Sequence, residues 1–104
     1  MTNNKNIIEL ENFIINNDEK TAFYKGNNLN FTTKEFLLFL CLVKNYGIVM
    51  SRKAILEDVW RFDYLGETNL VDVYIKYVRN KLDYRFNVKY IRTIRGIGYM
   101  FLME

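Results

Sequence analysis

The clearest pattern in the sequence is a nearly continuous apolar run, "FLLFLCLV", at residues 36–43. Thr32 precedes this run, and Glu35 follows Thr32 by three residues, which is the spacing of a capping box at a helix N-terminus. Gly47 comes soon after the run and is a typical helix stop. Because nearly every side of the helix is apolar, the pattern predicts a buried central helix over residues 33–46.

A second periodic stretch lies at residues 69–82, where apolar residues recur at spacings of four, three and four. These residues are Val71, Ile75, Val78 and Leu82. At about 100° per residue they share one face of a helix, which we expect to pack on the core. The opposite face carries Asn69, Val73, Lys76, Tyr77 and Asn80. An ordinary solvated helix would show more Glu and Lys, so this outer face is a candidate binding surface.

The remaining predicted elements are shorter. Ser51 caps a helix over residues 52–60, and "IVM" before it is a short extended piece. Residues 7–31 are rich in β-branched and aromatic residues separated by "NNDE" and "GNN", which predicts a small antiparallel meander. Residues 88–102 predict a closing β-hairpin. The order meander, three helices, hairpin predicts a single α+β domain over residues 1–104, of the winged helix-turn-helix class.

The predicted hairpin holds two arginines and a Gly-x-Gly inside an apolar run. A wing needs cations on a tight turn that stands away from the core. Gly96 and Gly98 permit positive φ and close approach to a phosphate backbone. Arg95 at the tip suits a narrow minor groove, where the negative potential is strongest, and Arg92 suits a phosphate. A plain hairpin turn is the alternative explanation of the two glycines.

The charge distribution and the composition favour some classes of function and exclude others. The net charge is +3, and residues 76–95 hold seven Lys or Arg against Asp83 alone, which indicates a polyanion partner unless this is a solvated face. There is no histidine and only one cysteine, Cys41, so the usual zinc sites and Ser-His or Cys-His catalysis are excluded. Cys41 lies in the apolar run and is expected to be a buried, inert thiol. We expect no metal and no cofactor.

The lengths of the apolar segments also indicate where in the cell the protein is located. The longest one, residues 36–43, is far shorter than the roughly 20 residues needed to cross a bilayer. The N-terminal residues lack the apolar core of a signal peptide. We therefore expect a cytoplasmic protein with no membrane partner.

Three stretches of the sequence resemble the DNA-binding effector domain of OmpR/PhoB-type response regulators over about residues 7–102. They are "LNFTTKEFLLFLCLVKNYGIVMSRKAILEDVW", "TNLVDVYIKYVRNKLD" and "YIRTIRGIGYMF". The resemblance implies a four-stranded N-terminal antiparallel sheet, three helices, a C-terminal wing and transcriptional control through sequence-specific binding of double-stranded DNA. It also implies head-to-tail pairs on direct-repeat half-sites, and a phosphorelay in which a sensor kinase acts on a receiver domain. The receiver domain is missing here, so the chain is either an excised effector domain or a natural stand-alone form.

Candidate site residues follow from the outer helix face and the wing. The base-contact candidates are Asn69, Val73, Tyr74, Lys76, Tyr77 and Asn80. Asn can pair with adenine and valine can touch a thymine methyl, whereas Tyr74 could equally flank the core. The phosphate candidates are Arg52, Lys53, Lys76, Arg79, Arg92, Thr93 and the backbone around Gly96, with Arg95 in the minor groove. We expect Asp72 to form a salt bridge to a nearby arginine.

Many relatives of the resembled family carry arginine where this chain has Asn69, Tyr77 and Asn80. The difference argues against guanine readout and points to A/T-rich sites. In the same family, the loop between the last two helices is similar to a docking site for RNA polymerase. The corresponding residues here are Phe62, Asp63, Tyr64, Leu65 and Gly66, although their side chains could instead fold back on the core.

Two other function classes remain open on the sequence alone. A non-catalytic protein-interaction module could keep the winged-helix scaffold, but it need not retain the basic segment or Arg95. A nuclease could use Asp58, Asp63, Glu67 and Asp72, yet these acids are scattered over two helices and a loop and have no histidine partner. We expect that the protein is not an enzyme.

Overall fold

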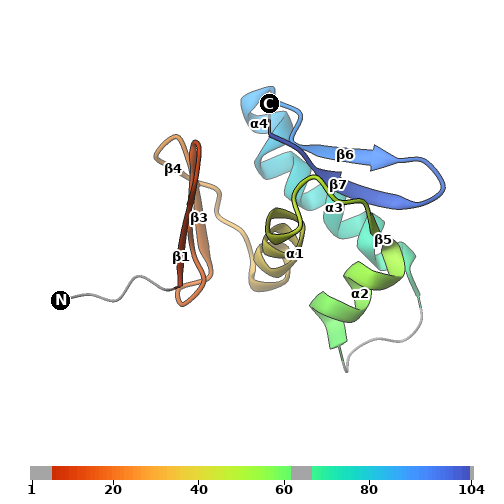
Figure 1. Ribbon diagram of the computed structural model, residues 1–104. Coiled ribbons are helices and arrows are strands. Elements are labelled where there is room, and N and C mark those ends of the chain that lie inside the picture. Colours follow the sequence, from red (N-terminus) through yellow and green to blue (C-terminus); the bar gives the residue numbers. More distant parts are fainter. Residues whose placement is uncertain (1–5, 62–66, 104) are drawn as a thin grey trace.

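The computed structural model describes residues 6–61 and 67–103, and Figure 1 shows two small sheets on either side of a helical centre. The N-terminal sheet has four antiparallel strands in chain order. They are β1 (Ile7–Leu10), β2 (Phe13–Asn16), β3 (Thr21–Tyr24) and β4 (Asn27–Asn28). The predicted α+β winged-helix fold with a four-stranded N-terminal sheet is confirmed. The sheet ends at residue 28, three residues before the expected limit of 31.

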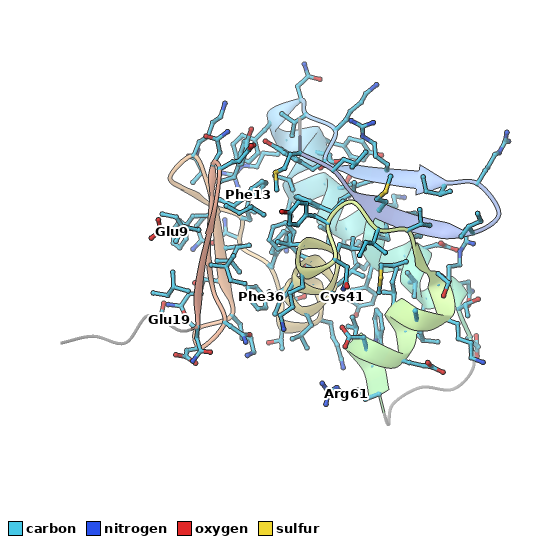
Figure 2. All side chains as sticks on the ribbon, in the orientation of Figure 1. Glu9, Phe13, Glu19, Phe36, Cys41 and Arg61 are labelled. Carbon is cyan, nitrogen blue, oxygen red and sulfur yellow. The ribbon has the colours of Figure 1, made fainter. Side chains whose placement is uncertain are left out.

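One face of this sheet is buried and the other is exposed, as the alternation of its strands requires. Phe13 and Ile15 have no exposed surface, whereas Ile14 between them is 51% exposed. In Figure 2, Phe13 points from the sheet toward the helices, while Glu9 lies on the outer side. The sheet therefore covers one flank of the helical centre.

The central helix α1 (Thr33–Lys44) begins at the predicted capping box. The Glu35 N–H donates to Thr32 Oγ1 at 3.3 Å, and the Thr32 N–H donates to Glu35 Oε1 at 2.9 Å. The helix ends two residues before the predicted 46, because Asn45 caps it and its Nδ2 donates to the carbonyl oxygen of Cys41. Gly47 does not itself end the helix. It lies in the following turn with φ +80°, and its N–H donates to the carbonyl oxygen of Phe101.

The other helices are α2 (Arg52–Trp60), α3 (Asn69–Lys81) and the short α4 (Asp83–Phe86). As predicted, Ser51 caps α2, and the apolar face of α3 is fully buried. Helix α3 ends one residue before the predicted limit of about 82, and the chain turns at Leu82 into α4, a short helix that was not predicted. The reason is a tertiary contact: buried Asp83 accepts the Ile91 N–H on Oδ2 at 3.1 Å. None of the helices within the described ranges is long and apolar enough to span a membrane.

The C-terminal hairpin consists of β6 (Ile91–Ile94) and β7 (Gly98–Phe101) within the predicted range 88–102. A third strand, β5 (Met50–Ser51), pairs with β7, so the wing sheet has the order β5-β7-β6. The sequence predicted an extended piece here but not its pairing. Gly98 makes the pairing possible, because a Cβ at this position would lie 1.9 Å from the carbonyl oxygen of Met50.

The role predicted for Gly98 is therefore wrong. Gly96 has the expected positive φ, at +75°, but Gly98 does not. Gly98 is buried, and it allows close approach of the protein's own strand β5 instead of a phosphate backbone.

A cluster of aromatic rings joins the two sheets through α1. Phe13 of β2, Phe39 of α1 and Phe101 of β7 are fully buried. The Phe39 ring centroid lies 5.7 Å from that of Phe13 and 5.8 Å from that of Phe101. Tyr90 stacks on Phe101 at 5.4 Å. Both sheets and the helices therefore share one hydrophobic core.

Cys41 is buried in α1, as the sequence predicted. Burial, followed by a hydrogen bond to the Asp58 carboxylate, raises the pKa of Cys41 to about 12. Because the thiolate is the reactive form, we expect iodoacetamide at pH 8 to leave the folded protein unmodified and to alkylate it only after unfolding in guanidinium. Mass spectrometry of both samples measures this. Rapid alkylation of the folded protein would contradict the buried position.

Candidate nucleic-acid interface

The outer face of α3 presents a group of exposed side chains opposite the buried stripe. Its residues are Asn69, Val73, Lys76, Tyr77 and Asn80, all exposed. Two of them, Val73 and Tyr77, are large apolar side chains. They are 42% and 43% exposed, respectively. Exposed apolar groups on a helix that already has its core face covered are available to contact a partner.

An aromatic row of three rings, Trp60, Tyr74 and Tyr77, connects this face to the core. The Trp60 ring of α2 is buried, and its centroid lies 5.1 Å from that of Tyr74 at an interplanar angle of 76°. Tyr74 in turn meets Tyr77 at 5.3 Å and 72°. Both are edge-to-face contacts, the geometry that aromatic pairs prefer. Tyr74 is half-buried, so it links the core to the exposed ring of Tyr77.

The start of α2 is tied to α3 and the wing by one carboxylate. Arg52 Nε donates to Asp72 Oδ1 at 2.8 Å, which is the predicted salt bridge. The Tyr99 hydroxyl of β7 donates to the same oxygen. The Asp72 carboxylate raises the pKa of Arg52, and burial followed by the hydrogen bond to Asp72 raises the pKa of Tyr99. Both donors therefore keep their protons at neutral pH.

Arg79 ties α3 directly to the wing. Its Nη2 donates to the carbonyl oxygen of Ile91 at 3.0 Å and to Thr93 Oγ1 at 2.8 Å, both on β6. The guanidinium carbons of Arg79 and Arg52 each lie 5.6 Å from the centroid of the Tyr99 ring. Three phosphate candidates, Arg52, Arg79 and Thr93, thus belong to one cluster where α3 meets the wing.

Tyr99 organises that cluster, yet the sequence did not single it out as a site residue. Tyr99 is only 5% exposed, so it is also part of the core. Its ring supports two arginines, and its hydroxyl reaches Asp72. The signal available in advance was its place directly after the Gly-x-Gly turn, which does not reveal contacts to helices far away in the chain.

The turn between β6 and β7 projects away from the helices (Figure 1). The Ile97 N–H donates to the carbonyl oxygen of Ile94 at 3.0 Å, which closes a four-residue turn around Arg95 and Gly96. Arg95, Gly96 and Ile97 are all exposed. On the nearby strand, Arg92 is exposed and its Nε donates to the carbonyl oxygen of Lys89 at 2.8 Å. A cation therefore stands at the tip of a narrow, protruding finger.

The exposed face of α3 thus lies beside a hairpin that carries a cation at its tip. The family described as "Transcriptional regulatory protein, C terminal" matches residues 26–101, from the end of the first sheet through β7. The chain belongs to this family. The resemblance to OmpR/PhoB-type effector domains is thereby confirmed, and the family is one of regulatory domains and not of enzymes.

Two members of the family illustrate how similar this chain is to known proteins in sequence and in fold. The uncharacterized transcriptional regulatory protein YkoG of Bacillus subtilis is 49% identical over 84 residues, which are 80% of this chain and 37% of YkoG. The Thermotoga maritima response regulator DrrB, an OmpR/PhoB homolog, is 33% identical with a TM-score of 0.79, over 95% of this chain and 45% of DrrB.

A third similar protein was solved with DNA. The Klebsiella pneumoniae RstA DNA-binding domain in complex with the RstA box is 29% identical with a TM-score of 0.80, over 92% of this chain and 96% of that domain. The curated relatives are longer proteins, and the chain spans less than half the length of those it matches. The similarity to the curated relatives therefore applies to one domain of those proteins and not to their full length.

Other candidate site residues from the sequence do not belong to the cluster that connects α3 with the wing. Lys53 is exposed in the first turn of α2 and is the sequence neighbour of Arg52. The polymerase-loop candidates, residues 62–66, lie outside the described residues. Within the described ranges, no three acidic, histidine or cysteine side chains gather into a group that could hold a metal ion.

Proposed function

We propose that this domain binds double-stranded DNA sequence-specifically and so controls transcription. The observation that carries the proposal is the joint placement of the α3 outer face and the cationic wing, which Arg79 ties together. A major groove admits an α-helix, and a protruding hairpin with an arginine at its tip suits the adjacent minor groove. The family membership and the DNA-bound structure of RstA support the same assignment.

In this proposal α3 reads base edges, and the surrounding cations bind phosphates. Base contacts are assigned to Asn69, Val73, Tyr74, Lys76, Tyr77 and Asn80. Phosphate contacts are assigned to Arg52, Lys53, Lys76, Arg79, Arg92, Thr93 and the backbone of Gly96, and the minor-groove contact to Arg95. Since Asp72 partly neutralises Arg52, the Arg52, Asp72 and Arg79 cluster keeps a net positive charge. That remaining charge favours a phosphate at the junction of α3 and the wing.

The wider assignments rest on the longer relatives, which include the staphylococcal response regulator ArlR. We assign the chain as the effector domain of a cytoplasmic two-component response regulator. Its receiver domain would be controlled by a sensor kinase, and two domains would bind direct-repeat half-sites head to tail. The loop at residues 62–66 would contact RNA polymerase.

Selection of bound sites from a random duplex library tests the proposal. We expect enrichment of one motif, and a fall of binding with salt as counterions are released from neutralised phosphates. The slope of log K against log [salt] gives the number of phosphates contacted. Failure to enrich any duplex would overturn the proposal and favour the protein-interaction alternative.

Arg95→Ala is expected to weaken binding to the selected site by about 1–3 kcal/mol, because the variant removes the proposed minor-groove cation. Fluorescence anisotropy with a labelled duplex measures the change. Lys25→Ala is the matched control, since it removes one exposed positive charge from the turn after β3. Equal affinities for the two variants would count against a wing contact.

A further inference from the structure

We infer that the outer face of α3 selects A·T base pairs in the major groove, partly through the methyl groups of thymine. This inference rests on the proposed function and specifies the DNA that the site prefers. It concerns four exposed residues, called here the outer stripe: Asn69, Val73, Tyr77 and Asn80. They follow each other at spacings of four, four and three, so they fall within a narrow arc of the helix.

Each side chain of the outer stripe matches a feature that A·T pairs display in the major groove. The carboxamides of Asn69 and Asn80 can donate to adenine N7 and accept from its N6 amino group. Val73 and Tyr77 offer exposed apolar surface, and the thymine C5 methyl is the apolar group in that groove. The stripe contains no arginine to read guanine and no carboxylate to read cytosine. Lys76 is the residue of this helix face whose side chain most commonly contacts guanine.

The aromatic row restrains the Tyr77 ring through its edge-to-face contact with Tyr74. Its ring is the exposed end of the series from Trp60 through Tyr74. A side chain held by its neighbours loses less conformational freedom on binding, so its apolar contact contributes more to affinity. Together with Val73, four residues earlier, Tyr77 forms a preorganised apolar surface along the stripe.

The stripe spans about 16 Å along the helix axis at 1.5 Å per residue, which is comparable to about five base-pair steps. A helix crossing the groove does not bring all four residues to the bases equally. We therefore expect two or three consecutive A·T pairs with strong preference in each half-site.

Modified duplexes separate this readout from other sources of A/T preference. Replacing thymine with uracil removes one methyl group and leaves base pairing intact. Replacing A·T with inosine·cytosine gives the major groove the acceptors of a G·C pair, while the minor groove still lacks the guanine amino group. The parent duplex is a site recovered by the library selection, changed at one pair at a time.

We expect uracil to weaken binding about four-fold at each contacted thymine, from the loss of one buried methyl group. Inosine·cytosine is expected to weaken binding roughly five- to 150-fold at a pair read by an amide. Tyr77→Ala and Val73→Ala should reduce the sensitivity to uracil at the pair that each residue touches. Tyr84→Ala is the matched control, because Tyr84 is a 65% exposed tyrosine on α4, outside the stripe.

The outcomes distinguish the two hypotheses. If the protein binds no duplex at all, the proposed function itself is refuted. A protein that binds its selected site with unchanged affinity after both base replacements still binds DNA but does not read A·T pairs through α3. Retained binding to inosine·cytosine alone would place any A/T preference in the minor groove and overturn the inference. Unfolding midpoints of the variants, measured in parallel, show that each remains folded.

Discussion

Replacing Phe39 with alanine is expected to lower the free energy of unfolding by about 3–5 kcal/mol, the usual cost of removing a fully buried phenylalanine. Phe39 has no exposed surface, and its ring contacts Phe13 of the first sheet and Phe101 of the wing sheet. The cavity would therefore open where α1 holds both sheets. For a domain of this size the loss is a large share of the total stability. Urea unfolding followed by circular dichroism measures it.

Two further variants make the Phe39 result interpretable. Phe39→Leu keeps most of the apolar volume and should cost clearly less than alanine. Tyr84→Ala removes an exposed ring and should change stability by about 0.5 kcal/mol or less. A loss below about 1 kcal/mol for Phe39→Ala would show that this ring does not join the sheets as described.

Gly98→Ala is expected to lower the free energy of unfolding by about 3 kcal/mol, at the upper end of the usual cost of overpacking. The added Cβ would lie 1.9 Å from the Met50 carbonyl oxygen and 2.9 Å from its carbonyl carbon, both backbone atoms that cannot swing aside. Strand β5 would have to separate from β7. Because Ser51 both ends β5 and caps α2, the start of α2 would shift as well. Thermal unfolding and hydrogen exchange at residues 50–51 measure the two effects.

The other glycine of the wing provides the contrast for Gly98. An added Cβ at Gly96 meets nothing within 4 Å, but φ is +75° there, so alanine should cost only about 1–2 kcal/mol. Asparagine tolerates this conformation better, so Gly96→Asn should recover part of the loss whereas Gly98→Asn should recover none. Similar costs for alanine at both positions would contradict the close packing of β5 on β7.

The features predicted correctly are those that local chemistry determines. The capping box at Thr32 and Glu35, and the buried face of α3, follow from spacing along one helix. The outer face of α3 was predictable as the complement of that buried face. By contrast, the break at Leu82 depends on Asp83 reaching the Ile91 backbone, and no local signal marks it.

The same distinction applies to the candidate site. Single cations and a salt bridge from Asp72 to an arginine were predictable from the sequence, but the identity of that arginine and the part of Tyr99 were not. Arg52, Asp72 and Tyr99 come from three elements and meet only after folding. The pairing of β5 with β7 is also a contact between distant segments. A pattern read along the chain reports which face of an element is apolar, and it does not report which distant side chains meet there.

The two sheets close over very different distances along the chain. In the first sheet each strand pairs with the next, as Phe13 does with Tyr24. In the wing sheet Met50 pairs with Tyr99, almost half the chain away, so that pairing closes a long loop at a larger cost in chain entropy. Contacts of this kind generally slow folding. The pairing of β5 with β7 is therefore expected to slow the folding of the domain as a whole, because both sheets belong to one hydrophobic core.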